Sequence, residues 1–372
     1  MTIKSLLIVL TALITPDWEG KNIMPSTEHI QIKQERYYTV EDFKSLKKFD
    51  THIHINTDEI TFVKLAQEDN FQFLDIVDDR PFGLPWTEQQ KFALLHLKNF
   101  PDQMEVATTF SVKGFNDKGW ADNTIKDLKL ALSKGAKAVK IWKNIGMDLR
   151  DEKGEFVMLD DPRLAPIFSF LVQNGIPLIG HNGEPRDCWL PLDKMTFSKS
   201  YYSSHPEYHM YLHPEFPSYE EHITARDNLL ERYPDLKFVG AHLGSLEWSL
   251  EELAERLDRY PNMRVDLSRI TNLQFHTLND RDKTRNFFIK YQDRLVYGTD
   301  KAINSSSEPE VLSKSIHDSW VRDWIFFVTD EQINLSGFGN LKGLKLPADV
   351  IDKIYYKNAK NWLSAGIPNK RD

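Results

Sequence analysis

Short apolar runs alternate with longer amphipathic segments along most of this chain. The runs that are typical of strands end in Gly, Pro or a polar residue, near residues 48–55, 71–77, 104–111, 136–142, 176–181, 236–242, 263–268 and 294–299. Several of the segments between them have the apolar spacing of helices, at residues 121–132, 162–173, 219–233 and 246–260. Eight strands with intervening helices predict an α/β fold, a TIM-like (β/α)8 barrel of parallel strands.

The connection between the fifth and sixth predicted strands is the longest, and residues 185–217 within it are rich in Pro and aromatic residues. A long connection on the catalytic face commonly shapes a site, so we predict a single domain with a long loop insertion after strand 5 that sets substrate specificity. Its histidines are His205, His209 and His213. His205 and His209 are four residues apart and could share a helical face as ligands, but ordinary loop pairing is favoured.

The two ends of the barrel sequence carry weaker signals. Residues 301–310 are rich in Ser and predict a loop, and helices are expected from 313 to about 329 and from 347 to 363. At the amino end, Lys4 precedes an apolar run over 5–14 that is too short to span a bilayer. This run resembles a secretory signal peptide with a poor cleavage signal, and a buried first helix or strand is the alternative.

These signals divide the chain into four parts. Residues 1–16 are a candidate signal peptide, 17–46 an N-terminal arm outside the barrel, 47–364 the barrel and 365–372 a C-terminal tail. The protein is then expected to be exported or periplasmic if the first segment is cleaved, and cytoplasmic if it is not.

Composition excludes several classes of partner. The net charge of −8 and the pI of about 5.9 argue against a general affinity for nucleic acid or anionic membranes. Beyond the amino end no segment predicts a membrane span. Cys188 is the only cysteine, so an intrachain disulfide is excluded, and a packed or loop thiol is favoured over a nucleophile.

Side chains with metal-binding chemistry stand at the ends of the predicted strands. His52 and His54 share one strand, whose two-residue period aims both imidazoles at one face. His181, His242 and Asp300 each close an apolar run at its carboxyl end. Each could be a cap or a satisfied core residue, but barrel enzymes place their chemistry on that face, and this ligand set suits zinc or a similar divalent ion.

Lys140 stands in another predicted strand, where it alternates with Val139 and Ile141. It is expected to point into the barrel, where a lysine is costly unless it is paired, carbamylated or serving a substrate. The alternative is a solvated strand end, which describes Lys143 better.

These segments resemble the amidohydrolase superfamily, specifically its amidohydrolase-related branch, which also contains metal-dependent decarboxylases of the aminocarboxymuconate-semialdehyde type. The resemblance runs over residues 48–363 and is carried by residues 50–54, 180–185, 238–244, 297–300, 344–347 and 353–359. It implies that the metal ligands are His52, His54, His181 and Asp300, and that His242 holds or polarises the substrate. It favours one ion, with zinc expected, or two ions if Lys140 is carbamylated and bridges them.

The leading hypothesis is metal-dependent hydrolysis of a lactone, ester or amide in a small polar substrate. A divalent cation lowers the pKa of bound water from about 16 toward about 7 and polarises a carbonyl oxygen. Asp300 then acts as general base and returns the proton to the leaving group, while His242 stabilises the oxyanion. Glu184 and Arg186 directly follow His181 and, with Lys140, are predicted to bind the substrate.

Two other functions stay open. One is a metal-dependent non-oxidative decarboxylase of an aromatic or unsaturated carboxylic acid, which needs cations for the substrate's acid groups. The candidates near strand ends are Arg80, Lys140, Arg186 and Arg269. The other is a noncatalytic binding protein on a metal-barrel scaffold, since fold does not fix function. In each case the expected partner is a small molecule, and homo-oligomerisation is left open.

Overall fold

The computed structural model describes residues 35–305 and 308–364 of the 372-residue chain. The candidate signal peptide over 1–16, the first part of the predicted arm and the predicted tail over 365–372 lie outside the described residues. Residues 36–46 of the predicted arm are described and contain one 3-10 turn, η1 (Val40–Lys44). Phe43 in this turn is buried against Phe71 and Trp324, so this part of the chain packs on the strands and on the helix that follows them.

Nine parallel strands form one curled sheet in the order β8-β7-β6-β5-β4-β3-β2-β1-β9. They are β1 (Lys48–Asn56), β2 (Phe71–Ile76), β3 (Met104–Thr109), β4 (Ala138–Ile141), β5 (Leu178–Gly180), β6 (Phe238–Gly240), β7 (Met263–Asp266), β8 (Leu295–Val296) and β9 (Lys301–Asn304). The first eight lie where the apolar runs predicted them. With the helices between them they form the predicted TIM-barrel α/β fold.

The ninth strand was not predicted, because residues 301–310 were interpreted as a loop. β9 pairs in parallel with β1 from Ile53↔Lys301 to Asn56↔Asn304. Just before it, Thr51 N donates to Tyr297 O over 2.9 Å and Asp300 N donates to His52 O over 2.8 Å. β8, the short link and β9 therefore follow β1 as one interrupted strand, and these bonds join the two ends of the sheet. The unpaired edge of β1 supplies the order that the Ser-rich sequence does not.

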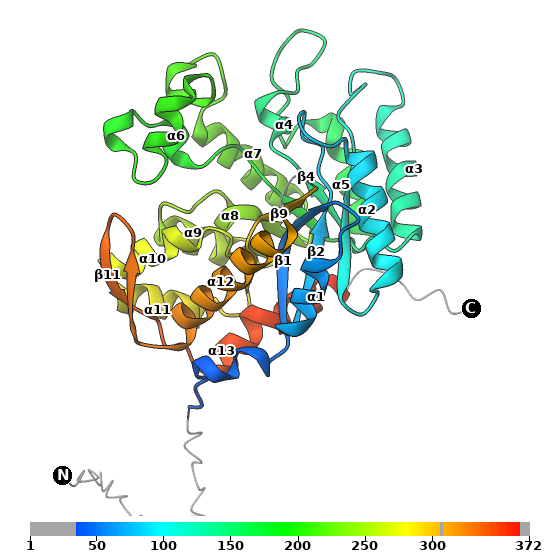
Figure 1. Ribbon diagram of the computed structural model, residues 1–372. Helices are drawn as coiled ribbons and strands as arrows, with labels where there is room; N and C mark the ends of the chain where they lie inside the picture. Colours follow the sequence, from blue (N-terminus) through cyan, green and yellow to red (C-terminus); the bar gives the residue numbers. More distant parts are fainter. Residues whose placement is uncertain (1–34, 306–307, 365–372) are drawn as a thin grey trace, which may run out of the picture. The chain divides into compact units, whose positions relative to one another are not determined.

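Helices fill the connections and flank the strands, with α2 and α3 on one side and α9 to α11 on the other in Figure 1, while α12 lies next to α1. The helices are α1 (Thr61–Glu68), α2 (Trp86–Asn99), α3 (Trp120–Ser133), α4 (Asn144–Met147), α5 (Ala165–Gln173), α6 (Lys199–Ser204), α7 (Tyr219–Arg232), α8 (Ala241–Gly244), α9 (Leu250–Arg259), α10 (Ile270–Asn279), α11 (Arg281–Lys290), α12 (Pro309–Val328), α13 (Ala348–Asp352) and α14 (Asn358–Ser364). A π-helical turn, Lys353–Lys357, joins the last two. The predicted helix over 246–260 begins later, at Leu250, because the Ser249 side chain caps it by accepting a bond from Glu252 N.

A bulge in β1 decides which side chains enter the barrel. The pairing of β1 with β2 changes register between Asp50 and Ile53. Phe49 packs in the small apolar cluster that includes Trp362 of α14. Ile53 packs instead in the larger core formed with the helices. Regular alternation would put Phe49 and His52 on opposite faces, and one extra residue puts them on the same face. The bulge therefore lets one strand supply both an apolar inner layer and the two histidines.

The insertion after β5 is not a bare loop. Besides α6 it contains the 3-10 turns η3 (Arg186–Trp189), η4 (Leu192–Lys194), η5 (Pro206–Tyr208) and η6 (Met210–Leu212). Its residues Cys188, Met195, Tyr202 and Met210 form a small apolar core with Met147 of α4. A hairpin of β10 (Gln332–Leu335) and β11 (Gly339–Lys342) packs against α10. Among the described residues, no helix is both long and apolar enough to cross a bilayer.

Candidate metal centre at the carboxyl ends of the strands

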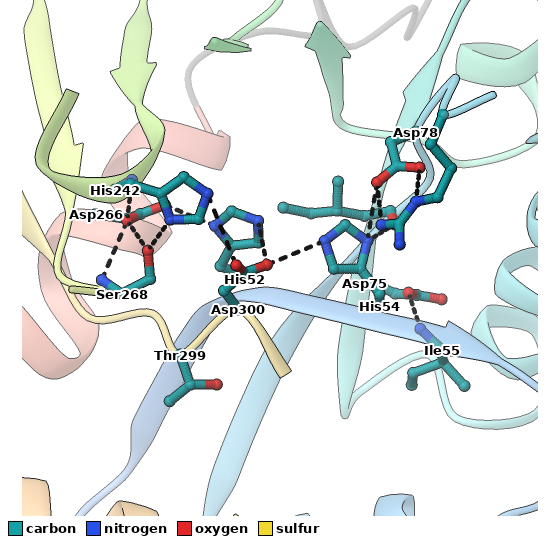
Figure 2. A network of polar contacts seen from close by, with 12 residues as sticks. His52, His54, Ile55, Asp75, Asp78, His242, Asp266, Ser268, Thr299 and Asp300 are labelled. Carbon is teal, nitrogen blue, oxygen red and sulfur yellow. Dashed lines mark hydrogen bonds and ion pairs between the residues drawn. The ribbon is translucent and has the colours of Figure 1, made fainter. Parts of the chain in front are cut away.

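Three imidazoles from two strands meet the Asp300 carboxylate at the carboxyl end of the barrel (Figure 2). Asp300 Oδ1 lies 3.3 Å from His52 Nε2 and 3.5 Å from His54 Nε2, and Asp300 Oδ2 lies 3.7 Å from His242 Nε2. One ligand atom each from His52, His242 and Asp300 lie within 4.8 Å of one another. The three histidines are at most 4% exposed. Four side chains spread over positions 52 to 300 of the sequence thus meet in one small volume.

His52 and His54 are oriented by hydrogen bonds to their other ring nitrogens. His52 Nδ1 lies 2.7 Å from Asp266 Oδ2, and His54 Nδ1 lies 2.7 Å from the carbonyl oxygen of Ile76. Since carboxylate and carbonyl oxygens only accept, each Nδ1 must carry the proton. Each Nε2 then presents a lone pair toward Asp300, which is the form that binds a metal.

Asp266 at the end of β7 also organises His242. Its Oδ1 accepts bonds from His242 N at 2.8 Å, Ser268 Oγ at 2.6 Å and Ser268 N at 3.1 Å. Ser268 Oγ in turn lies 2.8 Å from His242 Nδ1. While the Ser268 hydroxyl donates to Asp266, it accepts from His242 Nδ1, and His242 Nε2 is left with a lone pair as well.

The backbone at His242 and Asp300 is left-handed, a conformation that side chains other than Gly rarely adopt. The φ angles are 57° at His242, 59° at Leu243, 58° at Ser245 and 58° at Asp300. Such residues cost about 1–2 kcal/mol each, so the surrounding structure must hold them in place. At the first turn, Arg226 Nη1 donates to Gly244 O, Tyr219 OH donates to Ser245 O, and Ser245 Oγ donates to Asn182 O over 2.8 Å.

The link that leads to Asp300 is held by Asp50 and is tightly packed at Gly298. Asp50 accepts bonds from Thr299 Oγ1 at 2.7 Å, Trp320 Nε1 at 3.0 Å and His52 N at 3.1 Å. A Cβ atom at Gly298 would lie 3.1 Å from His52 Cβ and 3.4 Å from Asp266 Cβ. The strand with the two histidines and the link with Asp300 are therefore fastened to each other.

Burial and mutual charge set the protonation states of the cluster. Burial, followed by the charge of Lys140, lowers the pKa of His52, and burial lowers the pKa of His242 to about 3. Burial alone would raise the pKa of Asp300, but His52 and His242 outweigh it and hold that pKa well below its usual range. His52 and His242 are consequently neutral and Asp300 ionised at neutral pH, as a cation site requires.

His181 and Lys140 lie beside this cluster. The ring of His181 is 4.5 Å from that of His242 between centroids, and burial lowers its pKa well below the usual value. Lys140 is 1% exposed, and its Nζ has no hydrogen-bond partner among the described residues. Burial lowers its pKa, against the attraction of Asp266 and Asp300. Lys140 therefore faces the barrel interior as predicted, and an orphaned buried amine indicates a ligand or modification there.

The described contacts of Glu184 and Arg186 are with residues outside the cluster. Glu184 forms an ion pair with Lys143, and the Arg186 guanidinium lies 3.9 Å from the centroid of the Trp248 ring. Their role in binding substrate stays a prediction. On the other side of the cluster, Asp78 lies 3.6 Å from His54 Nδ1 and accepts two bonds from Arg80, one of them 2.6 Å long from Arg80 Nε.

The three histidines of the insertion bond to backbone carbonyls of their own segment. His205 Nδ1 lies 2.9 Å from Tyr201 O, His209 Nε2 2.8 Å from Leu190 O, and His213 Nε2 3.0 Å from Pro206 O. This is the loop pairing favoured for His205 and His209.

The residues that sequence reasoning missed are Asp266, Ser268 and Asp78. A usable signal existed for Asp266, because it closes the apolar run of β7 as Asp300 closes that of β8. Nothing in the sequence shows that its carboxylate reaches a histidine 214 positions away.

Comparison with known proteins gives a consistent family and fold. The model of the family described as Amidohydrolase matches residues 109–364, which include Lys140, His181, His242 and Asp300 but not His52 and His54. A search of curated proteins returned no match.

Three similar solved structures each cover 86% of this chain with a TM-score of 0.50. They are an uncharacterised TIM-barrel protein from Bordetella bronchiseptica (16% identity, 99% of its chain covered), 2,6-dihydroxybenzoate decarboxylase from Rhizobium (15%, 98%) and a putative amidohydrolase from Staphylococcus aureus (14%, 100%). At these identities the likeness shows the fold alone.

Proposed function

Because the chain belongs to the amidohydrolase family, we propose that it is a metal-dependent hydrolase of a C–O or C–N bond, in a lactone, ester or amide of a small polar substrate. The observation that carries this proposal is the ionised Asp300 carboxylate, with three buried Nε2 atoms at 3.3 to 3.7 Å from its oxygens. Neutral imidazoles and a carboxylate around one point are the donors of a catalytic divalent-metal site.

A single divalent ion suits these donors. The ligand atoms that lie within 4.8 Å of one another are those of His52, His242 and Asp300, and the ring of His181 lies 4.5 Å from that of His242. We propose His52, His54, His181 and Asp300 as its ligands, with zinc favoured by the number of imidazoles. A second ion would require a further ligand, for which we propose carbamylated Lys140. When bound, a divalent cation lowers the pKa of water and polarises a carbonyl oxygen.

The protein's own residues then move the proton. Asp300 is held ionised, so it can accept the proton of the attacking water and pass it to the leaving alkoxide or amine. His242 is proposed to polarise the substrate carbonyl. For that role its proton must be on Nε2, and a rotation of the Ser268 hydroxyl from Asp266 to His242 Nδ1 allows this form.

Decarboxylation is the second candidate, and the cations around the site favour it. Lys140 is buried among the histidines, and the charge of Arg80 acts on the same group of carboxylates that includes Asp300. The likeness to the Rhizobium decarboxylase agrees with this alternative in fold only. In this reaction carbon dioxide leaves with its carbon–carbon bond broken, and a proton taken from water replaces it on carbon, delivered through Asp300 or His242.

The experiment is a screen of lactones, N-acyl compounds and aromatic acids with the purified protein, read out as acid or amine release and as carbon dioxide release. Hydrolysis that disappears after chelation and in Asp300→Asn supports the proposal. The surface variant Asp330→Asn, whose carboxylate pairs with Lys345, is the matched control and should keep full activity. Hydrolysis that survives both treatments refutes the mechanism, and carbon dioxide release without hydrolysis favours the second candidate.

Two further proposals concern selectivity and location. Substitutions at Glu184 and Arg186 should change which substrate is accepted and leave the metal content intact. Export depends on cleavage of the candidate signal peptide, and sequencing the amino terminus of the mature protein tests it.

A further inference from the structure

A large cavity lies directly beside the candidate metal centre. Its volume is about 620 Å³, within the range typical of small-molecule sites, and it lies between the ends of β7 and β8, the amino end of α10, helix α12 and strand β10. Phe197 and Ser198 of the insertion form part of its wall. Five separate segments of the chain thus line it.

The cavity is positively charged. Arg269, Lys301 and Arg322 line it, and among the described residues that do so Asp323 is the one acid. Asp323 is 7% exposed and accepts a 2.7 Å bond from the Tyr297 hydroxyl, so its carboxylate is already engaged by the protein. Three cations around one partly engaged carboxyl attract an anionic ligand.

Arg269 and the helix it precedes strengthen this preference. Arg269 Nε is buried and has no hydrogen-bond partner among the described residues. Arg269 is also the N-cap residue of α10, where its side chain makes no capping bond, and Ile270, Thr271 and Asn272 of the first turn line the cavity. The first N–H groups of a helix lack partners within it and carry partial positive charge, so they favour an anion at this end.

The cavity is lined by residues that contact or adjoin the reacting groups. Ser268, which lines the cavity, lies 2.8 Å from His242 Nδ1 through its hydroxyl. Thr299 and Lys301, which also line it, are the chain neighbours of Asp300. Figure 2 shows Ser268 beside His242, with the Thr299 side chain directed away from the histidines. The cavity therefore borders the link that carries Asp300 and the serine that contacts His242.

We propose that this cavity binds a carboxylate group of the substrate, and that the substrate is a small organic acid whose reacting bond lies at Asp300. This inference rests on the proposed function for the reaction, but the binding site itself does not require it. Arg269 and Arg322 bind the carboxylate, because a guanidinium presents paired donors that match the two oxygens. Lys301 adds charge at the side nearest Asp300.

The test measures equilibrium binding of succinate, phthalate and inorganic phosphate to the purified protein by isothermal titration calorimetry. We expect a carboxylate to bind more tightly than phosphate, and Arg269→Gln and Arg322→Gln each to weaken its binding about tenfold, a change of about 1.4 kcal/mol. Lys314→Gln removes a charge from the same helix as Arg322, but its side chain is 74% exposed and points elsewhere. This control should bind like the parent.

Other outcomes overturn the proposal. These are unchanged binding in both arginine variants, absence of carboxylate binding in the parent, tighter binding of phosphate, or binding that is lost on chelation but not in the arginine variants. If Arg269→Gln fails to fold, the partly exposed Arg322 still decides the matter. Calorimetry needs no turnover, so arginine-dependent binding without hydrolysis refutes the proposed function alone, and hydrolysis without arginine-dependent binding refutes the cavity alone.

Discussion

Asp266→Asn tests whether the carboxylate that contacts His52 and His242 sets the orientation and protonation of these imidazoles. One Asp266 oxygen accepts three donors, His242 N, Ser268 N and Ser268 Oγ, and the other accepts from His52 Nδ1. An asparagine can keep its oxygen toward the three donors only if its NH₂ group faces His52. The asparagine NH₂ group and the protonated Nδ1 of His52 would then both be donors facing each other, unless the His52 proton moves from Nδ1 to Nε2.

That proton would occupy the atom that faces Asp300, and His52 could no longer bind a metal in its neutral form. Loss of a carboxylate that orients a ligating histidine typically costs about 10- to 100-fold in metal affinity or activity. We therefore expect the dissociation constant for zinc to rise by about that factor, or about 1.4 to 2.8 kcal/mol in binding free energy. The fold should survive, because asparagine is isosteric with aspartate.

The assay is competition for zinc with a chromophoric chelator, with metal content measured by mass spectrometry and folding by circular dichroism. His52→Ala gives the value for a lost ligand. Asp323→Asn is the matched control, since this carboxyl is also buried but accepts from the Tyr297 hydroxyl instead of an imidazole. If Asp266→Asn binds zinc within about twofold of the parent while His52→Ala does not, the orienting role derived for Asp266 is wrong.

Two further predictions concern buried groups outside the site. Burial lowers the pKa of Lys48 to about 7, so between pH 7 and about 10.4 the unfolded chain binds more protons and the free energy of unfolding rises with pH. Lys48→Met removes this contribution, and in urea titrations its stability relative to the parent should fall by about 2 kcal/mol from pH 7 to pH 8.5; a constant difference contradicts the assignment. Burial also raises the pKa of Cys188 to about 11, and its thiol lies 3.0 Å from Tyr208 O. Iodoacetamide at pH 8 should therefore modify Cys188 at least about 100-fold more slowly than a cysteine peptide, and equal rates would show that the insertion opens.

The sequence by itself determined the eight main strands and the positions of the site residues along them. Buried parallel strands are short apolar runs, so the pattern locates them. The carboxyl ends of parallel strands lie at one edge of the sheet, so the histidines and Asp300 near those ends are expected to lie close together. β9 escaped prediction because Lys301 to Asn304 have no apolar run of their own. Their order comes from the free edge of β1, which lies about 250 positions earlier in the chain.

Only the tertiary structure decided how the site residues are held. The bulge after Asp50, the left-handed turn at His242, and the contacts of Asp266 with His52 and Ser268 depend on bonds between distant strands. The same is true of the cavity, whose cations come from Arg269 on one helix, Arg322 on another and Lys301 between them. Local sequence specifies most elements and the alternation of side chains along a regular strand, whereas the bulge in β1 changes that alternation. The direction of a hydrogen bond or the charge of a cavity depends on which elements pack together.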